Sequence, residues 1–353
     1  MMLISDKNIT NISTKTIYSF GSPCNGQYGH IVLLPNGDVV GYYNQNERKW
    51  SIRNNKLSLY SSIGIKTSEF DYIKSENIWI GRGVERKWPY YLIPTFNFNG
   101  LNKKKDSNDF SVLVNTIPKS GTYFLTSAFA NIGWKNSNFH LLGKNLIVDY
   151  RNSKNIGILD ASIKNMYEFP IELLAHITNG IVIPCHTEYF EIVDYFKKNK
   201  HLVVSVVRDL RNVLVSLYKF KDIMINQDIY DDIWLSKTGN DRYKHFINHY
   251  RDKDLSHILL IADMIIKEQN SIVLKYEEMS RGEITKENKY KIDIYCDSLA
   301  DRLSKELTLL YNKKTMTLIS NKRSNWKDEW NDHFDNFYHS SGMAEKNIRL
   351  GYN

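Results

Sequence analysis

The sequence has few cysteines and no long apolar run. Its 353 residues include only three cysteines, Cys24, Cys185 and Cys296, which lie far apart and form no CxxC pair. They provide neither a disulfide framework nor a cysteine-based zinc site, so a reducing cytoplasm is the simplest compartment. No stretch approaches the roughly 20 apolar residues that a membrane span requires. The N-terminus has no basic segment followed by an apolar one, so we expect no signal peptide and a cytoplasmic protein.

Proline and glycine are also scarce, which excludes a collagen-like or low-complexity chain. Hydrophobic residues make up 42% and charged residues 24%, as in globular proteins, and the length suggests two domains. The net charge of +8 suggests an anionic partner, such as nucleic acid, a membrane surface or a phosphorylated cofactor. No helix-turn-helix, zinc module or aromatic RNA-binding pattern supports nucleic acid.

The first part of the chain, residues 1–98, reads as a small antiparallel β domain of unknown role. Hairpin signals at Asn36-Gly37 and Asn54-Asn55 separate short strand-like runs. We expect a meander, closed or half-closed into a barrel, with Trp50, Trp79 and Trp88 in its core. The predicted strands are residues 28–34, 38–43, 48–53, 56–61 and 77–81.

Residues 99–109 (NGLNKKKDSND) resemble a linker, and residues 110–353 form the second predicted domain. Apolar strands alternate there with helical segments, which predicts an α/β fold with a mostly parallel sheet flanked by helices. The strands are expected at residues 110–117, 180–184 and 201–207, and the helices at residues 122–131, 188–198 and 213–220.

The most informative segment joins the first of these strands to its helix through Pro118-Lys119-Ser120-Gly121-Thr122. Such a turn directs backbone N–H groups at one point, and the helix dipole adds positive charge, so the turn is suited to phosphate. Lys119 adds a full charge and Gly121 allows close approach. The Walker pattern GxxxxGK[ST] is absent, which disfavours an ordinary NTPase.

A second segment ends the strand at residues 201–207 with Arg208, and Ser216 follows eight residues later. An arginine at the carboxyl end of a strand projects into the crevice where α/β proteins bind ligands. Its guanidinium group can hold a phosphate through two N–H bonds, with the serine hydroxyl as a further donor.

Together the two segments resemble the phosphate-binding sites of sulfotransferases that use 3′-phosphoadenosine 5′-phosphosulfate (PAPS). The family loop reads approximately PK[ST]GT, and its second site has arginine and serine eight residues apart. The resemblance covers residues 110–334 and implies a P-loop-like fold. It assigns the binding of PAPS, and of its product PAP, to Lys119, Ser120, Gly121, Thr122, Tyr123, Phe124, Arg208 and Ser216.

Two further matches refine the predicted site. In the family a catalytic histidine precedes the arginine by some twenty residues, and His186 precedes Arg208 by 22. The segment containing Tyr276-Glu277-Glu278-Met279 resembles a family segment whose tyrosine contributes to nucleotide binding. Both roles are implied by the resemblance, because a lone histidine after a strand is more often structural and a tyrosine there marks an ordinary strand end.

The sequence also departs from the family. A lysine usually stands two residues before the histidine, and Pro184 stands there in this chain. The family's C-terminal segment over the 3′-phosphate is altered as well. Its Trp-Lys pair remains as Trp326-Lys327, the glycines are absent, and Arg323 is the candidate for the 3′-phosphate.

The resemblance implies in-line sulfuryl transfer to a hydroxyl or nitrogen, with His186 as general base, Lys119 stabilising the leaving group and no metal. Glu188 is the alternative base. Between residues 224 and 250, carboxylates stand beside aromatic residues, which suits a cationic small-molecule acceptor, such as a guanidinium toxin of the saxitoxin type in natural-product biosynthesis. The alternatives left open are a P-loop kinase or NTPase and a non-catalytic nucleotide- or carbohydrate-binding protein. The acidic and aromatic residues meant are Asp228, Tyr230, Asp231, Asp232 and Trp234.

Overall fold

The computed structural model describes residues 13–42, 44–85, 87–97, 109–143, 146–149, 166–177, 179–221, 231–268, 270–311 and 325–353. The described residues form two compact units. Residues 13–97, 146–147 and 166–177 make up the first unit, and the rest make up the second. The predicted linker lies, except for Asp109, outside the described residues, so the domain boundaries drawn from the sequence stay a prediction.

The first unit contains an antiparallel sheet that closes on itself. Its strands follow the order β3-β2-β1-β8-β7-β6-β5-β4. The two end strands, β3 and β4, meet at the bridge between Asp38 and Lys49, and Val39 N–H donates to the Arg48 carbonyl oxygen at 2.9 Å. The sheet is therefore a meander that closes into a small barrel, which leaves no long open edge. Its strands are β1 (Thr16–Ser22), β2 (Gly26–Leu33), β3 (Val39–Val40), β4 (Lys49–Arg53), β5 (Lys56–Tyr60), β6 (Lys66–Ile73), β7 (Ile78–Gly83) and β8 (Pro89–Asn97).

Tight turns and aromatic packing explain this unit. Asn54 and Asn55 have φ values of 52° and 59°, the left-handed pair that a two-residue hairpin loop requires. Trp79 lies in the core, only 2% exposed, and Trp50 is partly buried against it. The prediction for Trp88 is wrong, because this residue follows the β7–β8 turn and is 45% exposed.

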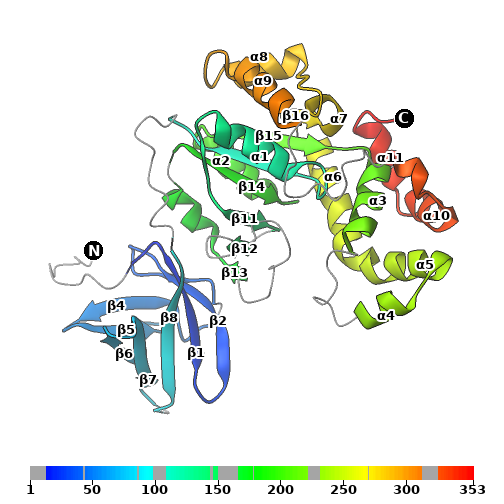
Figure 1. Ribbon diagram of the computed structural model, residues 1–353. Helices are drawn as coiled ribbons and strands as arrows, with labels where there is room; N and C mark the ends of the chain where they lie inside the picture. The colour runs from blue at the N-terminus through cyan, green and yellow to red at the C-terminus, as the bar shows by residue number, and fades with distance from the viewer. Residues whose placement is uncertain are drawn as a thin grey trace. The chain divides into compact units, whose positions relative to one another are not determined.

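The second unit is built on a parallel sheet. Its central order is β11-β14-β9-β15-β16, and each neighbouring pair is parallel (Figure 1). The strands are β9 (Val112–Thr116), β10 (Lys135–Asn136), β11 (Phe139–Leu142), β14 (Ile181–His186), β15 (Leu202–Val207) and β16 (Ile272–Lys275). Between β11 and β14 the chain also forms β12 (Leu146–Asp149), β13 (Met166–Glu168) and a 3-10 helix, Ile171–His176.

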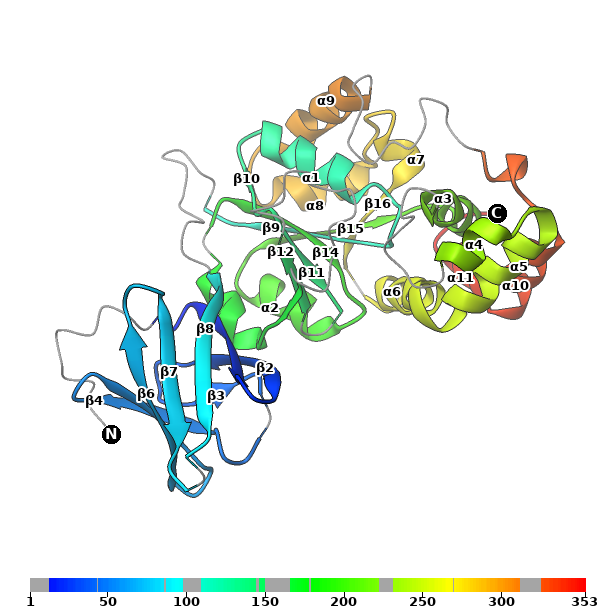
Figure 2. The same ribbon diagram turned by 60° about the horizontal axis from the view of Figure 1, so that its bottom comes forward.

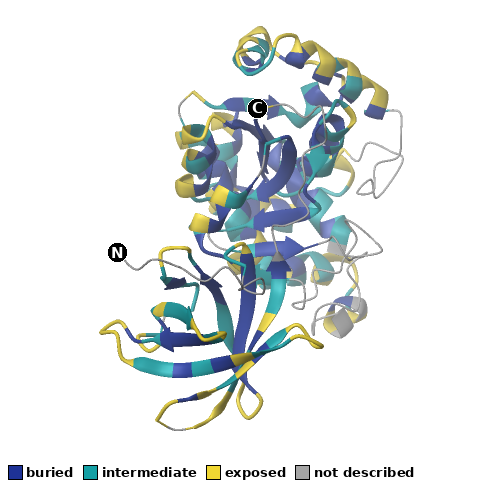
Figure 3. Cartoon of the chain, turned by 90° about the vertical axis from the view of Figure 1, so that its left-hand side faces the viewer, coloured by how far each residue is buried: buried dark blue, intermediate teal, exposed yellow. Residues whose placement is uncertain are grey.

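Helices cover both faces of this sheet. In Figure 2, α1 (Thr122–Asn131), α8 (Lys286–Asp293) and α9 (Leu299–Tyr311) lie on one face and α2 (Phe190–Lys198) lies on the other. Alternate strand residues, such as Val112 and Val114, pack under α1, α8 and α9 in one core cluster, because successive side chains of a strand point to opposite faces. Figure 3 shows this sheet as mostly buried. The predicted α/β fold with a preceding antiparallel β domain is confirmed.

The remaining helices gather beyond the β15 and β16 side of the sheet (Figure 1). They are α3 (Leu210–Lys221), α4 (Asp231–Ser236), α5 (Gly239–Tyr250), a π-helical turn (Arg251–Leu255), α6 (Ser256–Lys267), α7 (Tyr276–Met279), a 3-10 turn (Trp326–Asp328), α10 (Asp332–Ser340) and α11 (Met343–Arg349). None of the helices in the described parts of the chain combines the length and apolar character needed to cross a bilayer.

Candidate active site

The predicted site residues follow the carboxyl ends of adjacent parallel strands. His186 is the last residue of β14, Lys119 lies in the loop after β9, Arg208 directly follows β15, and Tyr276 directly follows β16. Because these strands are neighbours and parallel, their carboxyl ends meet at one edge of the sheet. The topology therefore brings together four residues from distant parts of the sequence.

The loop between β9 and α1, which we call the phosphate loop (residues 117–122), adopts two left-handed residues. Lys119 has φ 69° and Gly121, the N-cap of α1, has φ 95°. The first turn of α1 contains no acidic side chain, so the positive end of the helix dipole is not neutralised there. Ser120 is fully buried, and its Oγ has no hydrogen-bond partner among the described residues. The loop thus presents donors and positive potential suited to an anion.

Two cations meet at this loop. Arg208 donates a hydrogen bond to the Lys119 carbonyl oxygen at 3.0 Å, and Lys119 Nζ lies 3.6 Å from the centroid of the Phe220 ring. Neither side chain forms an ion pair with a described carboxylate, and Arg208 Nε is a buried donor without a partner in the described structure. Burial, together with the Arg208 charge, lowers the pKa of Lys119 to about 8. Such an arrangement is unfavourable until an anion neutralises it.

Tyr276, which follows β16, packs its ring against the phosphate loop. Its ring lies 4.7 Å from the Arg208 guanidinium carbon and packs directly on Gly121. A Cβ atom at Gly121 would stand 2.7 Å from Tyr276 Cδ2, so only glycine fits there. Contacts therefore join Lys119, Gly121, Arg208 and Tyr276 into one group.

The other predicted cofactor residues have less direct evidence. Ser216 is partly buried on α3, four residues before Phe220, and so lies on the helix face that meets Lys119. Thr122 is buried and Tyr123 is partly exposed, whereas the Phe124 side chain lies in the core beneath α1, which leaves its backbone N–H for binding. Arg323 lies outside the described residues.

His186 is held by the end of β9. One ring nitrogen, Nδ1, donates to the Thr116 carbonyl oxygen at 2.7 Å and lies 3.0 Å from Thr116 Oγ1. Thr116 Oγ1 in turn lies 2.6 Å from Thr122 Oγ1 in the first turn of α1. Burial, aided by the charges of His257 and Lys119 and opposed by the bond to Thr116, lowers the pKa of His186 to about 4. The imidazole is therefore neutral near pH 7, with Nε2 as the acceptor nitrogen.

Two histidines missed by the sequence reasoning surround His186. His140 from β11 is 4% exposed, and its ring centroid lies 4.4 Å from that of His186. His257 from α6 lies 2.9 Å from Glu188, the alternative base. The described His, Cys, Asp and Glu side chains form no group of three or more that could hold a metal ion. Neither His140 nor His257 belongs to a motif, so no pattern in the sequence points to them.

The C-terminal residues support the strand ends that carry the site. Asn347 accepts from Leu210 N–H at 2.8 Å and donates to Asp209, next to Arg208. Tyr352 donates its hydroxyl to Glu277 at 2.7 Å, next to Tyr276. The ring centroid of Trp326, from the predicted Trp-Lys pair, lies 4.4 Å from the Arg211 guanidinium carbon. The Trp326 backbone N–H donates a hydrogen bond to Asn212 Oδ1 at 3.0 Å. These contacts hold the residues that directly follow Arg208 and Tyr276.

Comparison with known proteins identifies the family of the chain. Residues 109–343 match the family described as sulfotransferase domain. The chain belongs to the sulfotransferase family. No curated protein sequence matches the chain. Among solved structures, the sulfotransferase is similar to mouse sulfotransferase SULT7A1 complexed with PAP, with 14% identity, 69% of this chain and 89% of that chain covered, and a TM-score of 0.39. It is also similar to retinol dehydratase in complex with androsterone and inactive cofactor PAP, with 13% identity, 80% and 96% covered, and a TM-score of 0.40.

The segment in which the sequence analysis expects the acceptor is described only in part. Asp228 and Tyr230 lie outside the described residues. Trp234 is fully buried, and the Arg242 guanidinium carbon lies 4.4 Å from its ring centroid. The Trp234 ring is therefore buried and already contacted by a cation of the chain, and the cationic acceptor stays a prediction.

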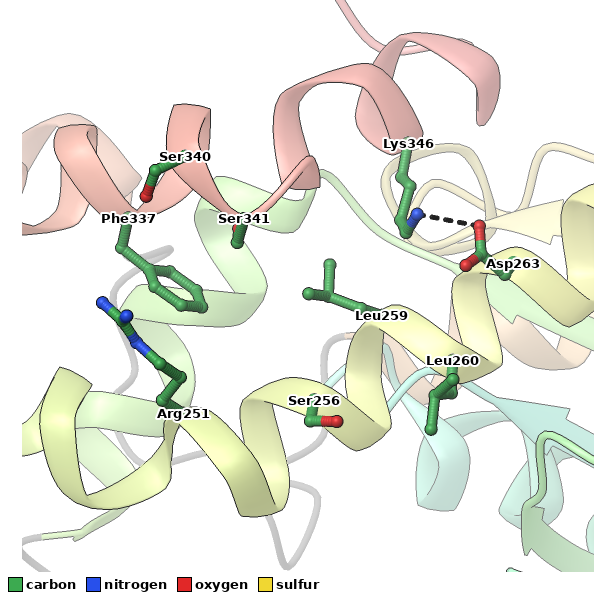
Figure 4. A pocket seen from close by; sticks show the side chains of 9 residues that line it. All are labelled: Arg251, Ser256, Leu259, Leu260, Asp263, Phe337, Ser340, Ser341 and Lys346. Carbon is green, nitrogen blue, oxygen red and sulfur yellow. Dashed lines mark ion pairs between the residues drawn. The ribbon is translucent and has the colours of Figure 1, made fainter.

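A separate pocket of about 360 Å³ lies between α6 and the α10–α11 segment of the sulfotransferase (Figure 4). The ion pair between Lys346 and Asp263, at 2.9 Å, stands at one side, and Arg251 stands over Phe337 at the other. None of its lining residues belongs to the predicted site.

Proposed function

We propose that this sulfotransferase uses PAPS and transfers a sulfuryl group in line to a hydroxyl or nitrogen of a small-molecule acceptor. The observation that carries the proposal is the meeting of Lys119 and Arg208, both without a described carboxylate partner, at the N-terminus of α1. When bound, PAPS supplies the sulfuryl group and PAP remains as the product. Buried donors without partners at Ser120 and Arg208 support the fit of such an anion.

The binding roles follow from position. The Ser120 hydroxyl and the backbone N–H groups from Gly121 to Phe124, at the start of α1, would hold the 5′-phosphate. Arg208 and Ser216 would hold the 3′-phosphate, and the Tyr276 ring beside Arg208 would contact the nucleotide. Arg323 stays a prediction for the 3′-phosphate, as does a cytoplasmic location.

His186 would act as general base for the acceptor. Because Nδ1 donates to the Thr116 carbonyl oxygen, Nε2 carries the free lone pair that can accept the proton of the acceptor. Lys119 would supply positive charge at the phosphate loop as the acceptor bond forms, and its position on the loop needs no rearrangement of the backbone. Pro184 is buried at the position of the family lysine, so Lys119 is our candidate for that charge as well.

Glu188 remains the alternative base, although its carboxylate is bonded to His257 at 2.9 Å. The acceptor stays a proposal of class only, a small molecule with a hydroxyl, amine or guanidinium nitrogen. A saxitoxin-type guanidinium compound remains one option. Calorimetric titration with PAP present compares cations with neutral phenols, and a preference for the phenols would contradict a cationic acceptor.

Ligand binding tests the cofactor assignment. PAP should raise the melting temperature, since at 100 times its Kd it stabilises the folded protein by about 2.7 kcal/mol. Neither ATP with magnesium nor an oligonucleotide should match it. A larger effect of ATP with magnesium would favour a kinase or NTPase instead.

Substitution tests the chemistry. Lys119→Ala and His186→Ala should each lower kcat by roughly 10²–10³-fold, the range for lost charge stabilisation or acid–base catalysis. Lys305→Ala and His339→Ala are matched controls, because both residues are exposed and far along the chain from the site. Near wild-type kcat in both site variants would contradict the mechanism.

A further inference from the structure

His140 stands beside the proposed base without any assigned role. It lies two residues before Leu142, the β11 residue that pairs with His186, so its side chain is on the same face of the sheet as His186. The two ring planes meet at 47° with centroids 4.4 Å apart. His140 thus limits the rotation of His186 on the side away from the hydrogen bond to Thr116.

The opposite side of His140 contacts the first turn of α1. The Tyr123 ring meets the His140 ring edge to face, at 6.0 Å and 83°, and the Tyr123 hydroxyl lies 3.5 Å from His140 Nδ1. Tyr123 is the second residue of the helix that starts at the phosphate loop. A continuous set of ring contacts therefore runs from the loop through Tyr123 and His140 to His186.

The chemistry of His140 makes a purely space-filling role costly. Burial, with the neighbouring His186, lowers the pKa of His140 well below its ordinary value, so the ring is neutral. Its Nε2 atom is buried and has no hydrogen-bond partner among the described residues. Burial of an unpaired polar nitrogen is unfavourable, and an apolar ring would fill the same space without that cost.

We propose that His140 is a positioning residue that links occupation of the phosphate loop to the orientation of His186. The inference rests on the proposed function, because it takes the anion at the loop to be a nucleotide such as PAP. An anion bound to the first N–H groups of α1 holds Tyr123 in one position, Tyr123 holds His140, and His140 holds the His186 ring against Thr116. Occupation of the loop thus adds to the hydrogen bond with Thr116 in fixing the His186 ring, so the base is most ordered after the nucleotide has bound.

The experiment follows the imidazole signals of His186 by NMR with labelled histidine, in the full chain, while PAP is added. In the wild type, PAP should shift and sharpen the His186 signals. In His140→Ala the response should fall by at least half, while the calorimetric Kd for PAP changes less than threefold. Activity should show the same split, with kcat about tenfold lower and KM for PAPS nearly unchanged.

Two further variants separate positioning from folding. Tyr123→Phe keeps the ring and removes only the hydroxyl, and His140→Phe keeps a ring in contact with His186. Both variants should retain part of the His186 signal change on PAP addition. They therefore test the linkage even if His140→Ala folds poorly. His201→Ala is the matched control, because His201 is also a buried histidine packed on an aromatic ring, with its ring centroid 5.5 Å from that of Phe196. His201 directly precedes β15 and so lies at the amino ends of the parallel strands, away from the site. The control should leave the response of His186 intact.

The outcomes distinguish the inference from the proposed function. A wild-type response of His186 in His140→Ala would overturn the linkage. If His140→Ala does not fold, a wild-type response in both His140→Phe and Tyr123→Phe would overturn it. PAP binding without any change at His186 in the wild type would contradict only this inference. A failure of PAP to bind the wild type would contradict both.

Discussion

Gly121 occupies a position that no other residue can take without movement. Its φ of 95° lies in the left-handed region, and the Tyr276 ring occupies the space of a side chain. Lys119 nearby has φ 69°, which is uncommon for a residue with a Cβ atom and is a form of strain found at functional sites. The left-handed residues turn the chain so that the start of α1 points at the group formed by Lys119 and Arg208.

Gly121→Ala should therefore impair both stability and nucleotide binding. Gly342→Ala is the matched control, because Gly342 has φ 76° and is also the N-cap of a helix, yet it has open space around it. The control should lose about 1 kcal/mol of unfolding free energy through the backbone alone. Gly121→Ala should lose roughly 1–3 kcal/mol more through the clash with Tyr276 and bind PAP at least tenfold more weakly. Chemical denaturation and calorimetry measure the two effects, and equal losses in both variants would show that Tyr276 yields freely.

The lowered pKa values of His186 and Lys119 predict a pH dependence for the proposed reaction. His186, with a pKa of about 4, is neutral above pH 5, and Lys119, with a pKa of about 8, loses its proton as the pH rises through 8. We expect kcat/KM for PAPS to be flat from about pH 5 to 7 and to fall above pH 8, since this ratio reports the free enzyme. Bound anion raises the pKa of Lys119, so kcat should fall at higher pH than kcat/KM.

Lys119→Arg is the check, because arginine keeps its charge and should remove the fall between pH 8 and 9. The contribution of Lys119 to the free energy of unfolding should instead rise over this pH range. The pKa of Lys119 is lower in the folded than in the unfolded chain, so the unfolded chain binds more protons between pH 8 and 10 and this residue favours folding as the pH rises. A fall in kcat/KM that persists in Lys119→Arg would assign it to another group.

Among the elements, those with local signals could be predicted and those with distant partners could not. The helix predicted at residues 122–131 is α1, Thr122–Asn131, because an apolar strand, a turn and a helix follow one another within the motif. The residues at the strand ends also converge, since parallel order alone determines where strand ends meet. His140 could not be predicted, because its place beside His186 depends on the pairing of β11 with β14.

The barrel strand β8 shows why part of the fold escaped prediction. It contains Pro89 and Pro94, and proline argues against a central strand, yet β8 pairs with both β1 and β7. The register of β1 shifts between Ile17 and Tyr18, next to the pairing of Tyr18 with Pro94. A bulge there accommodates the missing N–H of proline, and a bulge depends on the partner strand. The sequence predicts a closed or half-closed barrel without deciding between the two, because closure between β3 and β4 rests on a few hydrogen bonds that no motif signals.

Across the whole molecule, the three cysteines report on different parts of the fold. Cys24 is exposed, Cys296 is partly buried, and Cys185 is buried in β14, where burial and the Glu188 charge raise its pKa well above the ordinary value. A thiol reagent should therefore label Cys24 first and Cys185 only when the second unit unfolds. PAP should slow the labelling of Cys185 and leave that of Cys24 unchanged, because the ligand stabilises only the folded second unit. Mass spectrometry of timed samples measures both rates, and equal slowing at both thiols would contradict this expectation.

The order of the strands in the sheet has a consequence for synthesis of the protein. The barrel uses strands from Thr16 to Asn97 and can close as soon as that segment leaves the ribosome. The proposed nucleotide site uses the loop after β9, the end of β16 and Asn347 of α11, so it spans most of the remaining chain. Contacts this distant in sequence form slowly. During translation, therefore, Lys119 and Arg208 are synthesised before Tyr276 and Asn347, the residues that pack beside them. A nucleotide in the cell can meet the complete site only after Asn347 has been synthesised.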